Sequence, residues 1–379
     1  MGPLKGFKIV EIAGIGPGQL AGMLLADMGA NVVRIDRPLR FDQAVSIDAR
    51  FDILNRSRPL IEVDLKTPEG VELVLDLCED ADAIFEGFRP GVMERIGLGP
   101  DACMARNRKL VYGRMTGWGQ QGPLAQHIGH DANFIGLAGV YACVGEKGGE
   151  PVYPMNLAGD MGGGGAYLVM GLLAALLEAG KSGHGQVVDA AMIDGAASQM
   201  AMIWGLRAAG LWKDERGSNI LDGGAPFSRS YRTKDGKYMV VAPIENHFYS
   251  NLMTILGLDD IDPATQMDPS CWEEVTERLK QVFLTRTRQQ WCDIFDQTET
   301  CVTPMLDMSE VASHPHNQAR QTFIEVDGLP QPAPAPRFSR TTSNVSQPAA
   351  APDPDIHRVL QEWGASADLL GRLAAPEQG

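Results

Sequence analysis

Short apolar runs separated by stretches of helical periodicity organise the first part of the chain. Runs of apolar residues that end at glycine or charged residues predict buried strands at 7–12, 31–36, 60–63, 83–86 and 110–112. Apolar positions with helical spacing predict helices at 19–28 and 69–79 between them. Strand, helix and strand within about 30 residues form a βαβ unit, so we expect a parallel sheet with helices on its faces.

The pattern continues differently after residue 165. The run that begins at Tyr167 predicts a helix of about 14 residues that is buried on most sides. Residues 185–189 are typical of a strand that leads into a helix capped by Asp189 and reaching Gly210. Asp235 and Gly236 indicate the turn of a hairpin over 231–241. Further helices are expected at 272–283 and 288–297 and from Ile244 onward, with a last amphipathic helix formed by Val359, Leu360, Trp363, Leu369 and Leu370.

The chain of 379 residues is too long for one simple core, so we expect two domains. Residues 1–190 form a large α/β domain, 191–219 a linking helix, and 220–325 a smaller α+β domain. Residues 326–379 are expected to give an extended linker, rich in Pro, Ala and Ser, and a helix that returns to the large domain.

Charge and cysteine content restrict the function. There are 33 basic and 48 acidic side chains, a net charge of −15, which argues against nucleic acid or an anionic membrane as partner. Six scattered cysteines without a C-x-x-C pair, and the absence of a signal-peptide pattern, lead us to expect a reduced, cytoplasmic protein. No zinc pattern is present, and the apolar run at 167–177 is too short to span a bilayer.

Two glycine-rich turns carry the candidate chemistry. Gly129 precedes His130, and Asp160 stands among five glycines at the start of the helix expected from Tyr167. Each side chain has a structural interpretation, since an Asp before a helix is usually an N-cap. The density of glycine suggests positive φ angles or close approach of a ligand. A His and an Asp beside free helix N–H groups suit proton transfer next to a carbonyl.

Two further features concern anionic ligands. Gly16, Gly18 and Ala21, followed by Asp36, match the dinucleotide fingerprint, although Pro17 removes a donor from the turn. A dehydrogenase that uses NAD is therefore one alternative, and a binding module without chemistry is another. Basic residues recur at or after the ends of the expected strands, where ligands of doubly wound sheets bind, and they predict one polyanionic ligand. They are Arg37, Lys66, Arg89 and Arg95.

Six motifs together resemble the racemase branch of the type III CoA-transferase (CaiB/BaiF) family over nearly the whole chain. They begin at Gly14, Val63, Glu86, Arg114, Gly129 and Gly159. The resemblance implies a Rossmann-like α/β domain, a smaller domain, and two chains interlocked in a homodimer that share each active site. It also implies an acyl-CoA substrate whose coenzyme A is part of the substrate, with no separate cofactor and no metal.

The resemblance assigns roles residue by residue. His130 and Asp160 match the acid–base pair that epimerises 2-methylacyl-CoA thioesters through an enolate, and Glu245 matches a glutamate near the catalytic His of relatives. Backbone N–H groups of residues 160–163 are expected to hold the enolate oxygen. The alternative within the family is a CoA-transferase with Asp160 as nucleophile. The segments expected to bind the acyl-CoA contain Arg37, Val63, Asp64, Leu65, Lys66, Gly87, Phe88, Arg89, Arg95, Gly129, Asp131, Ala132, Asn133 and Phe134.

Overall fold

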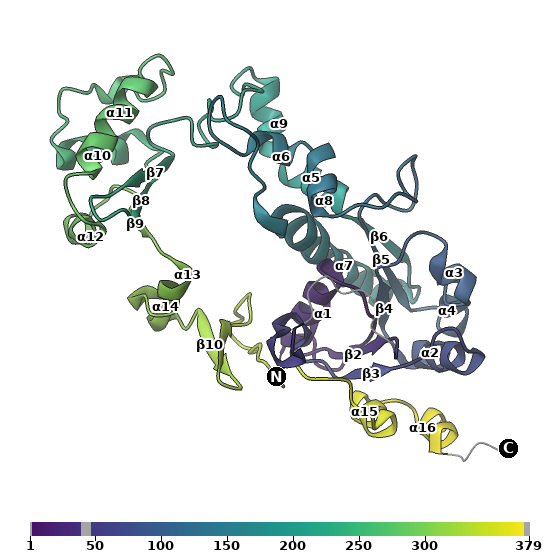
Figure 1. The fold of residues 1–379 in the computed structure, drawn as a ribbon. Coiled ribbons are helices and arrows are strands. Elements are labelled where there is room, and N and C mark those ends of the chain that lie inside the picture. The colour runs from purple at the N-terminus through teal and green to yellow at the C-terminus, as the bar shows by residue number, and fades with distance from the viewer. Residues whose placement is uncertain (1, 39–46, 375–379) are drawn as a thin grey trace. The chain divides into compact units, whose positions relative to one another are not determined.

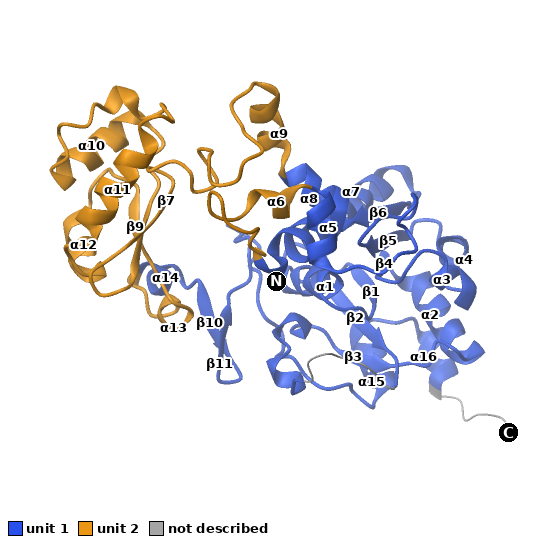
Figure 2. Ribbon diagram, turned by 45° about the horizontal axis from the view of Figure 1, so that its top comes forward, with its two compact units in different colours: residues 1–138, 155–199, 316–379 blue, residues 139–154, 200–315 orange. Residues whose placement is uncertain are grey.

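The computed structural model describes residues 2–38 and 47–374 and divides into two compact units. The first contains residues 1–138, 155–199 and 316–379, and the second contains 139–154 and 200–315 (Figure 2). This division differs in detail from the predicted limits, because it places 139–154 and 200–219 in the second unit and 316–325 in the first.

A six-stranded parallel sheet forms the centre of the first unit (Figure 1). Its order is β3-β2-β1-β4-β5-β6, so the topological switch lies between β1 and β4, where doubly wound sheets bind ligands. All five strands predicted before residue 120 are present within a few residues, which confirms the α/β fold class. The strands are β1 (Lys8–Ile12), β2 (Asn31–Asp36), β3 (Leu60–Glu62), β4 (Ala83–Glu86), β5 (Val111–Thr116) and β6 (Val187–Ala191).

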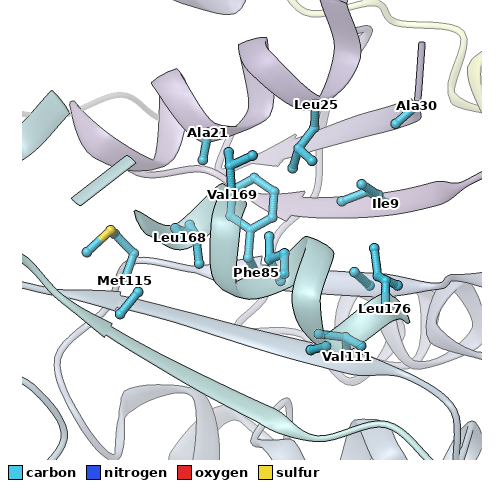
Figure 3. Packing of buried hydrophobic residues seen from close by; sticks show 14 of the residues in the cluster. Ile9, Ala21, Leu25, Ala30, Phe85, Val111, Met115, Leu168, Val169 and Leu176 are labelled. Carbon is cyan, nitrogen blue, oxygen red and sulfur yellow. The ribbon is translucent and has the colours of Figure 1, made fainter. Parts of the chain in front are cut away.

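Alternate residues of each strand enter two separate cores, one on each face of the sheet, which explains the continuous apolar runs. Ile9 belongs to the core covered by α1 (Pro17–Asp27) and α7 (Tyr167–Ser182), whereas Val10 belongs to the other. Figure 3 shows the first of these cores, with Phe85 beside Leu168 and Val169 of α7. The second is covered by α2 (Pro68–Asp80), α4 (Pro100–Arg106) and α15 (Ile356–Trp363). Both faces of the sheet are therefore closed by helices.

The C-terminal segment is part of the first unit. Val359, Leu360 and Trp363 of α15 are buried in the second core, and Trp363 Nε1 donates to the carbonyl of Ile9 at 3.3 Å. The single helix predicted here is two, because Gly364, with a φ of 93°, ends α15 before α16 (Ala367–Ala374) begins.

Asp160 lies in the first turn of a π-helical segment, η4 (Ala158–Ala166), that continues directly into α7. The glycine run was expected to reflect either positive φ angles or close approach of a ligand. The first alternative is wrong, since none of Gly159 and Gly162–Gly165 has a positive φ. These glycines instead allow close packing, because a Cβ on Gly163 would lie 2.6 Å from the backbone nitrogen of Ala196 in α8 (Met192–Gln199). Neighbouring helices, rather than a positive φ, explain the glycine run.

Three further predictions in this region are corrected. Asp189 lies inside β6 and does not cap a helix; its Oδ2 accepts from the backbone N–H of Gln120 at 3.1 Å. The helix expected to reach Gly210 is interrupted at Met200 and gives α8 and α9 (Ala201–Ala208). Helix α7 is less buried than expected, because Met170 and Leu177 are exposed.

The helical run over 155–182 is longer than the apolar run predicted at 167–177. By length and composition alone this run could cross a membrane. The earlier argument, that the apolar run is too short to span a bilayer, therefore does not hold for the whole helical segment. Its buried residues, among them Leu168 and Leu172, pack on the parallel sheet. We therefore interpret it as a core helix of the first unit.

The second unit has its own antiparallel sheet, in the order β7-β8-β9, and its own core. The predicted hairpin is confirmed as β7 (Arg229–Arg232) and β8 (Tyr238–Val241), with Gly236 at a φ of 78° in the turn. Its helices α10 (Asn246–Leu256), α11 (Trp272–Phe283) and α12 (Arg288–Phe295) match the prediction, and β9 spans Val302–Met305.

The remaining elements are short. A hairpin at β10 and β11 was not predicted and belongs to the first unit. These elements are α3 (Val92–Ile96), α5 (Asp131–Leu137), α6 (Val140–Cys143), α13 (Met308–Val311), α14 (Pro315–Arg320), β10 (Phe323–Val326), β11 (Leu329–Pro332), η1 (Ala49–Phe51), η2 (Ile53–Asn55), η3 (Met155–Leu157) and η5 (Pro263–Thr265).

Replacing Trp363 by alanine should destabilise the first unit by about 3–5 kcal/mol, because it removes a large side chain that is 3% exposed and leaves a cavity against the sheet. Urea unfolding followed by tryptophan-independent far-UV circular dichroism measures the change. Gln361→Ala, an exposed position on the same helix, is the control and should stay within about 0.5 kcal/mol of the parent. A Trp363→Ala variant as stable as this control would contradict the packing described.

Candidate active site

A cavity of about 580 Å³ opens at the carboxyl ends of the central strands of the first unit. Its wall is made by the turns that follow β1, β4 and β5 and by the start of η4. This is the place that the strand order predicts for a ligand. The lining includes Gly14–Gly18, Glu86–Pro90, Thr116–Trp118, His127–His130, Phe134, Asn156 and Asp160.

His130 stands at the N-cap of α5, with an extended backbone at φ −129° and ψ 173°. Its backbone N–H donates to Asn133 Oδ1 at 3.0 Å, so the amide of Asn133 fixes the turn that carries the imidazole. The His130 side chain is exposed and lines the cavity. Asn133, predicted to bind the ligand, therefore has a local structural contact as well.

Asp160 lines the same cavity from a second element, the start of η4. Its carboxylate accepts from Asn156 Nδ2 at 3.0 Å and lies against Gly16, where a Cβ would stand 3.2 Å from Asp160 Oδ2. Gly16 has a φ of 67° and precedes Pro17, the first residue of α1. The glycine turn after β1 thus leaves room for the Asp160 carboxyl group.

The environment of Asp160 favours its protonated form. Burial raises the pKa of this carboxyl, the hydrogen bond from Asn156 lowers it, and the nearby charges of Asp131 and His130 raise and lower it respectively. The net result is a pKa above the ordinary value of an aspartate. A half-buried carboxyl that can hold a proton, beside an exposed imidazole, is an arrangement for acid–base chemistry.

Aromatic packing fixes the segment that leads to His130. Phe134 is buried, and its ring lies so close to Gly117 and Gly129 that a Cβ on either glycine would overlap it. Trp118 meets the same ring edge to face, with 4.7 Å between the ring centroids. Phe134 was expected to contact the ligand; in this structure it also supports the loop of His130.

Glu86 begins one of the six motifs but was not predicted to be a functional residue; it ends β4 at the floor of the cavity. Its side chain is buried, Oε2 accepts from the backbone N–H of Phe88 at 2.6 Å, and Oε1 lies 3.3 Å from Arg114 Nε. Burial raises the pKa of Glu86 to about 7, against the lowering effects of the Phe88 N–H and of Arg114. The acidic residue in an otherwise apolar strand was the available signal.

The predicted phosphate-binding residues are all exposed at the expected edge of the sheet. Arg89 belongs to the wall of the cavity, whereas Arg37 follows β2, Lys66 follows β3 and Arg95 lies on α3, all outside that wall. Gly87 and Phe88 line the cavity with Arg89. The remaining predicted binding residues are the buried or half-buried Val63, Leu65 and Ala132 and the exposed Asp64.

Glu245 lies in the second unit, as the exposed N-cap of α10. His130 and Asp160 lie in the first, so the expected role of Glu245 stays a prediction. Within 2–38 and 47–374, no group of three His, Cys, Asp or Glu side chains is arranged to hold a metal ion.

Replacing Glu86 by glutamine should change how stability depends on pH. Between about pH 4.5 and 7 the folded protein keeps a proton on Glu86 that the unfolded chain has lost, so the free energy of unfolding falls as pH rises. The glutamine variant has no ionisable group at this position, so its free energy of unfolding does not fall with pH for this reason. Its unfolding free energy relative to the parent should rise from pH 5 to pH 8 by up to about 3 kcal/mol.

Urea unfolding of both proteins at several pH values measures the difference. Glu94→Gln is the matched control: burial raises the pKa of Glu94, but its hydrogen bonds with Arg114 outweigh this and lower it. The parent therefore gains stability from Glu94 as pH rises at acidic pH, the opposite sign. A pH-independent difference for Glu86→Gln would refute the proton held in the folded state.

The comparisons with known proteins agree with this arrangement. The model of CoA-transferase family III matches residues 4–358. The α-methylacyl-CoA racemase of Mus musculus is 42% identical over 376 residues, which are 98% of this chain and 96% of the relative. The α-methylacyl-CoA racemase of Homo sapiens is 39% identical over 379 residues, which are again 98% of this chain and 96% of the relative.

A crystal structure of a CaiB/BaiF family protein from Brucella suis superposes with a TM-score of 0.82 at 26% identity, covering 96% of this chain and 99% of that one. The chain therefore belongs to CoA-transferase family III.

Proposed function

We propose that the protein is an α-methylacyl-CoA racemase, which interconverts the (2R) and (2S) epimers of 2-methylacyl-CoA thioesters. The observation that carries the proposal is that His130 and Asp160, on two separate glycine-flanked turns, line one cavity. Relatives named α-methylacyl-CoA racemase, at 42% and 39% identity over nearly the full length, support the same activity.

The reaction needs two groups that share one proton across the α-carbon of the thioester. The thioester carbonyl acidifies this carbon because it accepts the charge as the proton leaves. Neutral His130 removes the proton from one epimer, and protonated Asp160 delivers a proton to the other face of the enolate. The opposite epimer reacts with the roles exchanged. The raised pKa of Asp160 supports the proton-carrying role.

The expected donors for the enolate oxygen need one revision. The backbone N–H of Asp160 donates to Asp131 Oδ1 at 2.7 Å, so it is not available to a substrate oxygen. Gly163 and its neighbours are buried against α8 and α1. Of the backbone N–H groups of residues 160–163 that were expected to hold the enolate oxygen, that of Asp160 is therefore excluded.

We further propose that the substrate is an acyl-CoA whose phosphates contact the exposed basic residues at the sheet edge. Arg89 stands nearest to the chemistry, since it lines the cavity. A homodimer with Glu245 reaching the site of the other chain is the proposed assembly. Exposed apolar side chains on the first unit, among them Leu137, Met170 and Leu177, support a covering chain.

The alternative is a CoA-transferase in which Asp160 attacks the thioester as a nucleophile. The name of the matched family favours it, as does a succinyl-CoA:glutarate CoA-transferase of Homo sapiens at 25% identity. Hydroxylamine added during turnover would trap an acyl adduct on Asp160 in a transferase and none in a racemase.

Incubating the protein with one epimer of a 2-methylacyl-CoA in D₂O tests the proposal directly. We expect the α-proton NMR signal to disappear while both epimers form without any added acid acceptor. Movement of CoA to an added free acid, with the α-proton retained, would establish the transferase instead.

His130→Ala and Asp160→Ala should each reduce turnover by about 10²–10⁴-fold, the usual contribution of an acid–base group. Both variants should fold, because one side chain is exposed and the other half-buried. His184→Ala and Asp194→Ala, exposed residues outside the cavity wall, are matched controls and should keep parental activity. Full epimerisation by the double variant His130→Ala/Asp160→Ala would exclude the assignment.

A further inference from the structure

A buried carboxylate connects the segments that carry the two proposed catalytic groups. Asp131 is 3% exposed, follows His130 directly in the chain and is the first residue of α5. Its Oδ1 accepts from the backbone N–H of Asp160 at 2.7 Å. One side chain therefore joins the turn of His130 to the turn of Asp160.

The contact between the two turns is close packed. A Cβ on Gly159 would lie 2.3 Å from Asp131 Oδ1 and 2.9 Å from Ile135 Cγ2, so α5 lies directly against the start of η4. Asp160 is next in the chain, and its side chain is held further by Asn156 Nδ2. The carboxylate of Asp131 thus fixes the main chain from which the Asp160 side chain projects.

We propose that Asp131 is a positioning residue: its buried carboxylate holds the main chain of Asp160 in the wall of the cavity that His130 also lines. Its negative charge also acts on the Asp160 carboxyl and raises the pKa of that group. The catalytic role of Asp131 rests on the proposed racemase activity. Its role in holding the main chain rests on the hydrogen bond between Asp131 and the backbone N–H of Asp160.

The charges around Asp160 support this role. Burial has the largest effect and raises the pKa of Asp160, and the hydrogen bond from Asn156 lowers it. Of the nearby charges, that of Asp131 raises this pKa and that of His130 lowers it. Helices α1, α7 and α8 also pack against η4, and they add no further charged group to this environment among the described residues. Beside burial, Asp131 therefore supplies the negative charge that raises the pKa of Asp160 among the described residues.

Asp131→Asn separates the charge from the shape, because the amide keeps an oxygen that can accept the Asp160 N–H. We expect Asp160 to titrate at lower pH in this variant than in the parent. The measurement is the ¹³C carboxyl shift of aspartate-labelled protein without substrate, with Asp160 assigned by the signal lost in Asp160→Asn. An unchanged Asp160 titration would overturn the proposal, whether or not the protein is a racemase.

Kinetics give the second readout. In Asp131→Asn the acidic limb of the kcat/KM profile should move to lower pH, and kcat/KM should fall by about tenfold for both epimers, because their equilibrium fixes the ratio of the two directions. Asp131→Ala also removes the acceptor and should lower kcat by about 10²-fold with little change in KM.

A rise in KM alone, with kcat and the pH profile unchanged, would instead assign Asp131 to ligand binding. Asp194→Asn, an exposed aspartate on α8, is the matched control for loss of one negative charge. If the parent exchanges no α-proton in D₂O, the proposed function fails, while the Asp160 titration still decides the role of Asp131.

Discussion

Close backbone packing at η4 is the constraint on which the site depends. A Cβ on Gly195 of α8 would lie 2.0 Å from the carbonyl oxygen of Gly163, and a Cβ on Gly165 would lie 2.8 Å from that of Pro17. Only hydrogen atoms can occupy these positions without displacing a helix. This contact sets η4 between α8 and α1, and it brings Asp160 to the glycine turn after β1. A side chain at Gly163 or Gly165 would require a neighbouring helix to shift.

The sequence was sufficient for the architecture of the first unit because its strands are buried on both faces. Runs such as Ile9, Val10 and Ile12 are continuous only when both sides of a strand meet a core, and that pattern marks a parallel sheet. The sequence was less informative where a polar residue can take either of two structural roles. Asp189 looks like an N-cap but serves a loop from within β6, and no local pattern separates the two roles.

The site was predictable as a pair and not as a network. Glycine-flanked His130 and Asp160 stand out in the sequence, whereas Asn156, Glu86 and the side-chain contact of Asp131 depend on tertiary distances. The same limit explains the fingerprint at Gly16, Gly18 and Ala21. Its first glycine is needed here because the carboxyl of Asp160 lies against it, which requires no dinucleotide.

Glu86 and Asp160 are two carboxyl groups of one cavity whose pKa values are both raised by burial, but their surroundings differ in other respects. Glu86 is closed off at the end of a central strand and is tied to the Phe88 N–H, so its charge is confined to the floor. Asp160 is half-buried at the wall, where a ligand can reach it and where Asp131 and His130 act on it with opposite signs. Burial is the largest cause of the raised pKa of both groups. What distinguishes Asp160 is its position beside an exposed imidazole, so that a proton leaving one group can be matched by a proton held on the other. A shared proton of this kind is the requirement of 1,1-proton transfer.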